Sequence, residues 1–323
     1  MKDFDSLTRR GKGQRYRKAL VEGLQAYPVE MKSIRLMSLE TKPVFRIHAD
    51  SGSYAAKFHD PTEHVLSQMM GELQFLDHIA RNSELCVETP LANIHGELVT
   101  EVSSSWLPDI AHFAICSWVP GRHLKDELSV RSYRYLGISS AMLHKASLSF
   151  EPKSDFRILI NDKVFYWDKE TILSRRDTAL LPSSRQKLFK EGARVAQSAI
   201  AKRWNSGSKP IVIHNDLHPC NIKLHKDRLS IYDFEDITWG YAGQDIGTAM
   251  YHIRFRKDYP RFLEAYREGY EQVTSWPIES DQQLDSFVIA RLLMFANYTV
   301  NYNIRPRHYL PVFEKRLDSL LSR

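Results

Sequence analysis

The sequence predicts an α+β protein of two lobes, with a small antiparallel-sheet lobe first and a larger, mainly helical lobe second. Two observations support this prediction. Short strand-like runs separated by turn signals dominate residues 29–119. Beyond Pro120-Gly121 the apolar residues recur at helical spacing instead. We therefore expect an N-terminal lobe at 1–118 and a C-terminal lobe at 119–323, with a ligand-binding cleft between them.

The first lobe is expected to contain a sheet and one helix. Turn signals at 41–43, 50–52 and 95–97 help to delimit five predicted strands, which are 31–39, 44–49, 53–58, 98–102 and 112–118. The helix is expected after Asp60-Pro61, where Asp60 can cap and Pro61 fits the first turn. Its apolar residues recur at three- and four-residue steps, at Leu66, Met69, Met70, Leu73, Leu76 and Ile79. This apolar stripe predicts that the helix packs on the sheet.

The second lobe is expected to be helical apart from one short strand-rich stretch. The predicted helices are 130–148, 167–178, 186–204, 245–256, 259–270 and 281–302. Between the third and fourth of them, residues 211–213, 222–224 and 229–232 read as short strands joined by tight turns. Polar residues at the ends of such buried strands are well placed for catalysis, because the scaffold holds them rigidly.

Composition restricts the class of protein. The 323 residues are 43% apolar and 26% charged, which is ordinary for a globular protein. The charged N-terminus lacks the apolar stretch of a signal peptide, and Arg291 interrupts the apolar stretch 286–300, so we expect no membrane span. Cys86, Cys116 and Cys220 are few and scattered, as expected for reduced thiols in a cytoplasmic protein. The oligomeric state stays open.

A net charge of +6 raises the question of a nucleic-acid partner. The one dense basic run, residues 9–18, is interpreted as a solvated helix face, and no nucleic-acid partner is expected. A basic nucleic-acid-binding protein stays as an alternative, to be tested by a salt-dependent shift of labelled RNA or DNA.

The residues that carry chemistry follow two of the short strands. Residues 214–221 match the pattern H-x-D-x-x-x-x-N, with His214, Asp216 and Asn221, and Asp233 follows the next hairpin. Three fixed residues at this spacing match by chance in roughly 4% of chains of this size. Phosphoryl transfer needs a carboxylate that orients the attacking hydroxyl, and an amide oxygen and a second carboxylate that hold Mg²⁺. Asp216, Asn221 and Asp233 supply this set.

These segments resemble two motifs of the aminoglycoside phosphotransferase/choline kinase family. His214 to Ile222 resembles its Brenner motif, and Ile231 to Asp236 resembles its Mg²⁺ motif. Gly240 to Ile246 resembles the next element, whose aspartate, here Asp245, helps to organise the catalytic loop. The resemblance implies a protein-kinase-like fold, ATP and Mg²⁺ as cofactors, catalytic roles for Asp216 and Asn221, and a metal site at Asn221 and Asp233. It also implies that His214 holds the catalytic loop in shape.

The first half of the chain resembles the remaining parts of the family in order. Lys57 resembles the strand lysine that meets the α- and β-phosphates, and Glu72 resembles the helix glutamate that pairs with it. The stretch with Ser117, Trp118 and Val119 resembles the hinge whose backbone holds adenine. One segment departs from the family: the phosphate-covering loop is expected near 36–44 and contains no glycine, so Ser38, Thr41 and Lys42 are candidates for side-chain contacts there.

Other interpretations of single residues stay open. His214, His218 and Cys220 could ligate zinc, and Cys220 could be a nucleophile rather than a small gap-filling residue. Asp236 could bind metal or substrate, or cap the following turn. A group at helical spacing could form core and rim or a substrate site; its members are Asn297, Tyr298, Asn301 and Tyr302.

The sequence predicts the donor side of the reaction better than the acceptor. We expect an ATP-dependent phosphotransferase acting on a hydroxyl of a small molecule, such as an amino alcohol, homoserine, a sugar or an aminoglycoside. A cationic acceptor could meet Glu235 and Asp236, and a carboxylate could meet Arg254 or Arg256. The alternatives are a Ser/Thr protein kinase of the same fold, although no activation segment is evident after Asp233, and a catalytically inactive nucleotide-binding module.

Overall fold

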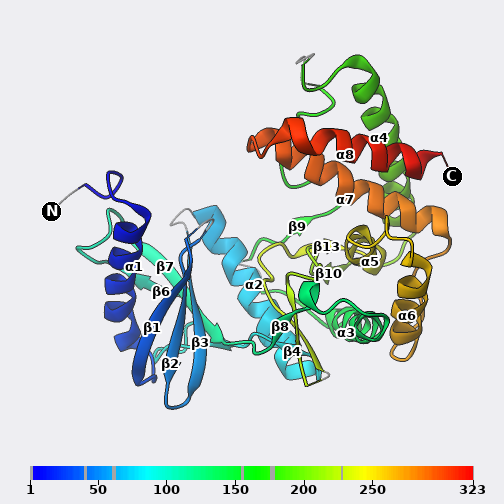
Figure 1. Cartoon of the computed structure of the whole chain (residues 1–323). Helices are drawn as coiled ribbons and strands as arrows, with labels where there is room; N and C mark the ends of the chain where they lie inside the picture. The colour runs from blue at the N-terminus through cyan, green and yellow to red at the C-terminus, as the bar shows by residue number, and fades with distance from the viewer. Residues whose placement is uncertain are drawn as a thin grey trace. The chain divides into compact units, whose positions relative to one another are not determined.

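The computed structural model describes residues 3–39, 42–59, 63–153, 156–174, 179–226 and 228–322. The chain forms two compact units (Figure 1), residues 1–121 with 151–157 and residues 122–150 with 158–323. The predicted capping residues Asp60 and Pro61 lie outside the described residues. Each unit has its own elements and is described by itself.

The first unit is built on an antiparallel sheet of mostly sequential strands. The order is β1 (Met31–Ser38), β2 (Val44–Ala49), β3 (Gly52–His59), β7 (Ala111–Ser117) and β5 (Pro90–Leu91), with β6 (Thr100–Val102) also on β7. The strands predicted at 31–39, 44–49, 53–58 and 112–118 are confirmed within one residue, and that at 98–102 is two residues shorter. Two-residue strands such as β5 and β4 (Cys86–Val87) are too short to give a sequence pattern.

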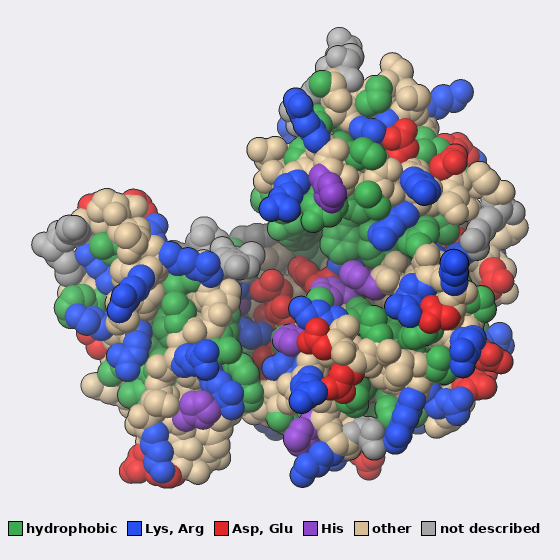
Figure 2. Space-filling model, viewed as in Figure 1, with side chains coloured by type: hydrophobic (Ala, Val, Ile, Leu, Met, Phe, Trp, Pro, Cys, Tyr) green, Lys and Arg blue, Asp and Glu red, His purple; other side chains and the backbone are tan. Residues whose placement is uncertain are grey.

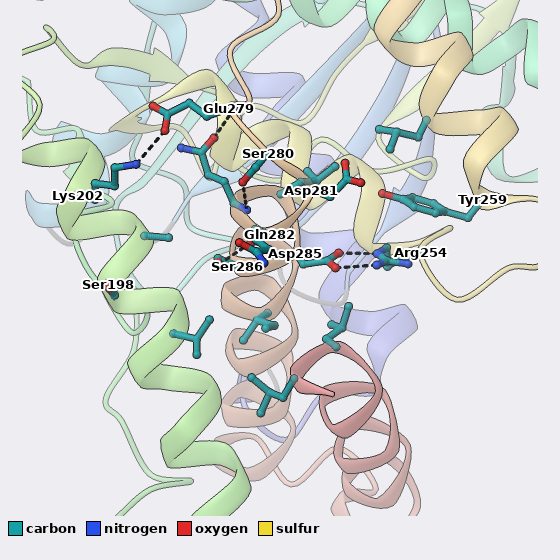
Figure 3. A pocket seen from close by; sticks show the side chains of 18 of the residues that line it. Ser198, Lys202, Arg254, Tyr259, Glu279, Ser280, Asp281, Gln282, Asp285 and Ser286 are labelled. Carbon is teal, nitrogen blue, oxygen red and sulfur yellow. Dashed lines mark hydrogen bonds and ion pairs between the residues drawn. The ribbon is translucent and has the colours of Figure 1, made fainter. Parts of the chain in front are cut away.

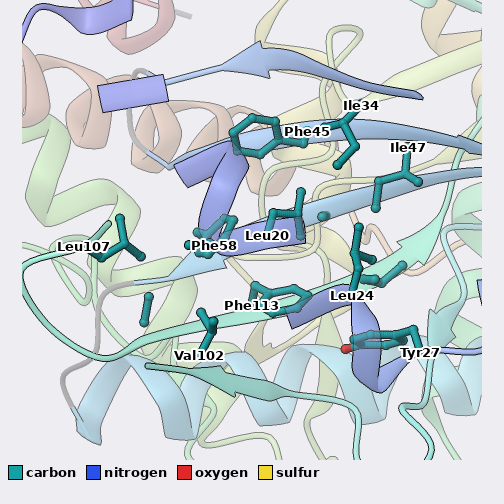
Figure 4. Packing of buried hydrophobic residues seen from close by; sticks show 14 residues of the cluster. Leu20, Leu24, Tyr27, Ile34, Phe45, Ile47, Phe58, Val102, Leu107 and Phe113 are labelled. Atoms are coloured by element: carbon teal, nitrogen blue, oxygen red, sulfur yellow. The ribbon is translucent and has the colours of Figure 1, made fainter. Parts of the chain in front are cut away.

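Two helices cover opposite faces of this sheet (Figure 1). Helix α1 (Arg9–Gly23), followed by a 3₁₀ turn at Leu24–Ala26, packs on Phe45, Phe58 and Phe113, as Figure 4 shows. Helix α2 (Glu63–Asn82) packs on the other face through Met69 and Leu73 against Ala114 and Cys116. Alternate residues of β7 therefore serve two cores, because successive strand side chains point to opposite faces.

The second unit is mainly helical. Its helices are α3 (Val130–Ser147), α4 (Ser183–Trp204), α5 (Ala242–Tyr251), α6 (Tyr259–Glu271), α7 (Asp281–Asn301) and α8 (Pro306–Leu321), with a 3₁₀ turn at Leu124–Asp126. Figure 1 shows α4, α7 and α8 packed together and α3 against α6. The two α+β units confirm the predicted fold class.

Short strands of the second unit position the polar loops. β10 (Ile211–Ile213) pairs with β13 (Thr238–Gly240), which pairs in parallel with β9 (Leu159–Ile160). β11 (Ile222–His225) pairs with β12 (Arg228–Ile231) and with β8 (Arg122–His123). The three predicted strands in this region are confirmed within one residue, and β10 is fully buried, as a rigid support for the following loop requires.

The helix predicted at 167–178 is wrong in its described part. Residues 167–174 form turns and irregular backbone, and 175–178 lie outside the described residues. Asn297 explains the difference: its side chain accepts from the N–H of Thr171 at 2.8 Å and donates to the carbonyl of Lys169 at 2.9 Å. These contacts with α7 satisfy backbone groups that a helix would otherwise pair internally.

The basic run at 9–18 lies in α1, as expected. Lys18 lies over the ring of Trp106, and Lys12 pairs with Asp5. On the face shown in Figure 2, the described Lys and Arg side chains are interspersed with acidic and neutral ones. Among the described residues, no helix combines the length and the apolar character needed to cross a bilayer.

Candidate active site

A buried carboxylate on α5 anchors the loop that follows β10. Asp245 accepts from the backbone N–H of His214 at 3.0 Å and from that of Asn215 at 2.5 Å. His144 of α3 donates its Nε2–H to Asp245 at 3.1 Å, and its Nδ1 accepts from the hydroxyl of Tyr270 at 2.9 Å. A buried carboxylate is stable only with such partners, so the network fixes the start of the loop.

Asn215 turns the chain immediately before Asp216. Its φ of 66° lies in the left-handed region, which asparagine tolerates better than most residues. Its side chain accepts from Asn161 at 2.8 Å and donates to the hydroxyl of Tyr166 and, at 3.2 Å, to the carbonyl of Asp236. The surrounding hydrogen bonds therefore maintain an unusual backbone conformation immediately before the predicted catalytic residue.

The carboxylate of Asp216 is hydrogen-bonded at both oxygens and is 15% exposed. Oδ2 accepts from Asn221 Nδ2 at 2.7 Å and from His218 Nε2 at 3.1 Å, and Oδ1 accepts from Arg291. Oriented in this way, a carboxylate can position a hydroxyl group and accept its proton. The structure thus brings together Asp216 and Asn221, two of the three residues predicted for phosphoryl transfer.

The two histidines of the loop are neutral donors and acceptors. His214 is fully buried, and burial lowers its pKa; its Nε2 bonds the carbonyl of Tyr232 at 3.1 Å and its Nδ1 accepts from the N–H of Asp216 at 3.2 Å. Burial lowers the pKa of His218 to about 4. Its Nδ1 accepts from the N–H of Cys220 at 3.0 Å, which leaves Nε2–H to donate to Asp216.

Asn221 and Asp233 lie at the same end of the β11–β12 hairpin. The N–H of Tyr232, just before Asp233, donates to the carbonyl of Asn221 at 3.1 Å. Asp233 has a φ of 67°, so this predicted metal ligand itself sits on left-handed backbone. The Asn221 amide directs its Nδ2 to Asp216, and its Oδ1 is the remaining polar atom. Amide and carboxylate oxygens are the donors that Mg²⁺ prefers, so this pair fits the predicted metal.

The sequence reasoning missed Arg291, which contacts the predicted catalytic carboxylate. Arg291 of α7 is 7% exposed, and it had been considered only as an interruption of the apolar stretch 286–300. A lone arginine at a buried position of an apolar helix is the signal that could have revealed it. Such a charge must be paired, and functional carboxylates are among the possible partners.

In the first unit Lys57 lies among buried carboxylates. Its Nζ is 2.8 Å from Glu88 Oε1 and 3.8 Å from Glu72 Oε1. The predicted pairing of Lys57 with Glu72 is therefore present, but Glu88 is the closer partner and was missed. Burial raises the pKa of the neighbouring Cys116 thiol well above its ordinary value, and the charge of Glu88 adds to this effect.

The predicted hinge residues are partly engaged by the sheet. The N–H of Ser117 donates to the carbonyl of Thr89, and the N–H of Trp118 donates to that of Ser53, at 2.8 and 2.9 Å. These two N–H groups are thus already used by the main chain. The predicted phosphate-covering loop, which contains no glycine, is partly strand, because β1 extends to Ser38. Thr41 of this loop lies outside the described residues.

The structure bears on two alternative interpretations of single residues, zinc ligation by the loop and acceptor binding by Arg254 or Arg256. Among the described residues no three His, Cys, Asp or Glu side chains are grouped to hold a metal, which does not favour zinc at His214, His218 and Cys220. Arg254 is bound by both oxygens of Asp285 and Arg256 by both oxygens of Asp258, so each has its own carboxylate.

The group at 297–302 divides into two roles. Asn297 and Asn301 bind the backbone carbonyl of Lys169, each at 2.9 Å. The rings of Tyr298 and Tyr302 lie beside that of Trp167, with centroids 5.9 and 6.4 Å from its centroid, and both Trp167 and Tyr302 are exposed. The asparagines thus hold the 161–174 segment on α7, and the aromatic rings form a surface.

A cavity of about 1090 Å³ lies among α4, α6, α7 and α8 and contains none of the residues of the loop 214–221. Figure 3 shows its two ion pairs, Lys202 with Glu279 at 2.9 Å and Arg254 with Asp285. Four of its charged side chains are therefore paired with one another, and none of them belongs to the group that converges on Asp216.

Comparison with known proteins decides the family. The sequence profile described as the phosphotransferase enzyme family matches residues 36–280. The chain belongs to this family. It is accordingly a phosphotransferase, and the predicted enzyme class is confirmed.

Individual relatives agree with this assignment. Amicoumacin kinase of Bacillus subtilis (strain 168) is 22% identical over 242 residues, which cover 72% of this chain and 67% of that protein. The structure of a microcompartment-associated aminopropanol kinase is 20% identical with a TM-score of 0.75, over 95% of this chain and 98% of that one. The structure of amicoumacin kinase hAmiN with AMP-PNP, Ca²⁺ and Ami is 15% identical with a TM-score of 0.74, over 97% of this chain and 96% of that one. These two structures share the fold.

Proposed function

We propose that this enzyme transfers the γ-phosphoryl group of ATP to a hydroxyl group of a small molecule. The observation that carries the proposal is the carboxylate of Asp216, which is held at both oxygens beside Asn221 on a loop anchored by Asp245. The aminopropanol and amicoumacin kinases among the relatives, and the structure of a spectinomycin phosphotransferase with ADP and spectinomycin, support a small-molecule acceptor.

In the proposed reaction Asp216 orients the acceptor hydroxyl for in-line attack on the γ-phosphorus. A bond forms between the hydroxyl oxygen and phosphorus, the bond from phosphorus to the β,γ-bridging oxygen breaks, and ADP leaves with that electron pair. Asp216 accepts the hydroxyl proton late in the step. His214 and Asp245 hold the loop, so the carboxylate keeps its direction during the reaction.

Asn221 and Asp233 would hold Mg²⁺, which neutralises the charge that develops on the phosphate oxygens. Lys57 would contact the phosphates, with Glu72 and Glu88 holding its ammonium group. The backbone near Ser117, Trp118 and Val119 would contact adenine; the N–H groups of Ser117 and Trp118 already pair with the main chain. Structures of similar proteins in complex with AMP-PNP and Ca²⁺, or with GDP, support a nucleotide and a divalent cation here.

The proposal is tested by ADP release with Mg²⁺ and ATP against a panel of amino alcohols, homoserine, sugars and aminoglycosides, with mass spectrometry of the products. We expect one class to gain a single phosphoryl group. If the purified chain binds Mg²⁺·ATP but phosphorylates no acceptor in the panel and releases no ADP, the inactive-module alternative is favoured instead.

A further inference from the structure

Arg291 is a charged side chain inside an apolar helix. On α7 its neighbours Ile289, Leu292 and Leu293 are buried, and Arg291 itself is 7% exposed. Burial lowers the pKa of its guanidinium to about 10, so the group still carries its charge at neutral pH. Because burying a charge is costly unless it is paired, the partner indicates the purpose of this residue.

The partner of Arg291 is the proposed catalytic carboxylate. Its Nη2 donates to Asp216 Oδ1, its Nη1 donates to the carbonyl of Asn215 at 3.4 Å, and its guanidinium lies 4.4 Å from the ring centroid of Phe295. One residue of α7 therefore contacts both the turn that presents Asp216 and the carboxylate itself.

We propose that Arg291 is a positioning residue that fixes the rotamer of Asp216 and, through it, the amide of Asn221. Oδ1 is held by Arg291, and Oδ2 is held by Asn221 and His218, so rotation of the carboxylate would break contacts on both sides. The same carboxylate orients Asn221, the proposed metal ligand. The arginine therefore acts on Asn221 indirectly, through Asp216. This role rests on the proposed function of Asp216.

The geometry differs from that of the stabilising ion pairs elsewhere in the same unit. Arg254 binds both oxygens of Asp285, at 2.6 and 2.7 Å, and touches no residue of the loop 214–221. Arg291 uses one nitrogen on Asp216, and its buried Nε has no hydrogen-bond partner among the described residues. An arginine placed only for stability would pair its Nε as Arg254 does, so the position of Arg291 indicates that it serves the carboxylate. Arg254, which pairs with Asp285 of α7, is thus a matched control.

The first experiment tests the ion pair without any turnover. Urea unfolding is measured for wild type, R291M, D216N and the double variant, and for the same cycle of R254M and D285N. We expect both single variants of each pair to destabilise and both pairs to show coupling. Additive losses at Arg291 and Asp216, together with coupling in the control pair, would overturn the contact. If R291M does not fold, R291K replaces it.

The second experiment measures the role in phosphoryl transfer, with water as the acceptor in Mg²⁺·ATP hydrolysis. We expect R291M to lower kcat about 10- to 100-fold with little change in the KM for ATP, and R291K to recover part of the rate. R254M should keep kcat within about twofold. In a D216N background R291M should cause no further loss, because the arginine acts only through that carboxylate.

Three outcomes separate the possibilities. A kcat of R291M no lower than that of R254M would overturn the positioning role while the function of the enzyme stands. An equal further loss in the D216N background would show that Arg291 acts elsewhere. Absence of ADP release by the wild type, with Mg²⁺·ATP bound, would refute the proposed function and this role with it.

Discussion

Lys57 contacts two buried carboxylates of the first unit, those of Glu72 and Glu88. All three side chains are largely buried, so their mutual attraction offsets the cost of removing them from water. Removing the ammonium group would leave the two carboxylates close together in a poorly solvated place.

We expect Lys57→Met to lower the free energy of unfolding by about 3–5 kcal/mol, because it removes the ammonium group that both buried carboxylates contact. Adding Glu88→Gln should recover part of that loss, since one carboxylate is then neutral. Urea unfolding of the single and double variants measures both effects. A double variant that is less stable than K57M alone would contradict the pairing seen here.

For single residues, the sequence predicts the functional ones that belong to a motif and misses those that belong to none. Asp216, Asn221 and Lys57 stand in recognisable spacings on strands or just after them. Glu88 contacts Lys57 from 31 residues away, and Arg291 contacts Asp216 from 75 residues away. Their importance depends on tertiary packing, which places a helix or a short strand beside the motif and leaves no local trace.

Helices α3 and α6 approach each other closely enough for their backbones to touch. A Cβ built on Gly137 would lie 1.9 Å from the carbonyl oxygen of Tyr266, and one on Gly269 would lie 2.0 Å from that of Arg134. These glycines therefore allow the close crossing. Since α3 also carries His144 to Asp245, the crossing supports the loop that bears Asp216.

We expect Gly137→Ala to lower the free energy of unfolding by about 3 kcal/mol or more, because the helices must separate to admit the methyl group. Gly11→Ala is the matched control: a Cβ there meets its closest atom, Leu7 Cβ, at 3.3 Å. That variant should stay within about 1 kcal/mol of wild type. Chemical unfolding of the two variants measures the difference, and equal stability would contradict the close crossing.

Element prediction succeeded where local pattern and packing agree. The apolar stripe at Leu66 to Ile79 places α2 on the sheet, and alternation in the strands of the first unit sets their register. It failed at 167–174, where Asn297 pairs with the backbone and the ring of Trp167 lies beside that of Tyr298. There the tertiary contacts override a weak helical periodicity, which a single sequence cannot reveal.

At the scale of the whole molecule, buried histidines link stability to pH. His59 is buried at the end of β3, and burial, with the charges of Lys42, Lys57 and His112 adding to it, lowers its pKa to about 2. The unfolded chain binds a proton at His59 near pH 6.5, whereas the folded chain does not. The stability contributed by this histidine is therefore complete above pH 6.5 and is lost as the pH falls toward about 2.

We expect the free energy of unfolding to fall on acidification below pH 6, with His59 contributing a slope approaching about 1.4 kcal/mol per pH unit. His59→Gln should show a slope smaller by about this amount, whatever its stability at pH 7. Urea unfolding from pH 7 to pH 5 gives both slopes. Identical slopes would show that His59 is protonated in the folded chain.

The two compact units follow the change of pattern near Pro120-Gly121, but the return of residues 151–157 to the first unit was not predicted. Within that segment the N–H of Arg157 donates to Ser67 of α2 at 3.0 Å. A single hydrogen bond of this kind has no sequence signature. The sequence therefore predicts the order of the two units along the chain better than it predicts which residues belong to each unit.

The most direct test of the central claim compares wild type with Asp216→Asn in Mg²⁺-dependent ADP release, alongside calorimetric binding of Mg²⁺·AMP-PNP. We predict that the variant binds the nucleotide about as tightly as wild type. We also predict that it releases ADP about 10²- to 10⁴-fold more slowly, because the carboxylate acts on the acceptor hydroxyl. Turnover by Asp216→Asn at the wild-type rate would contradict the assignment of this residue.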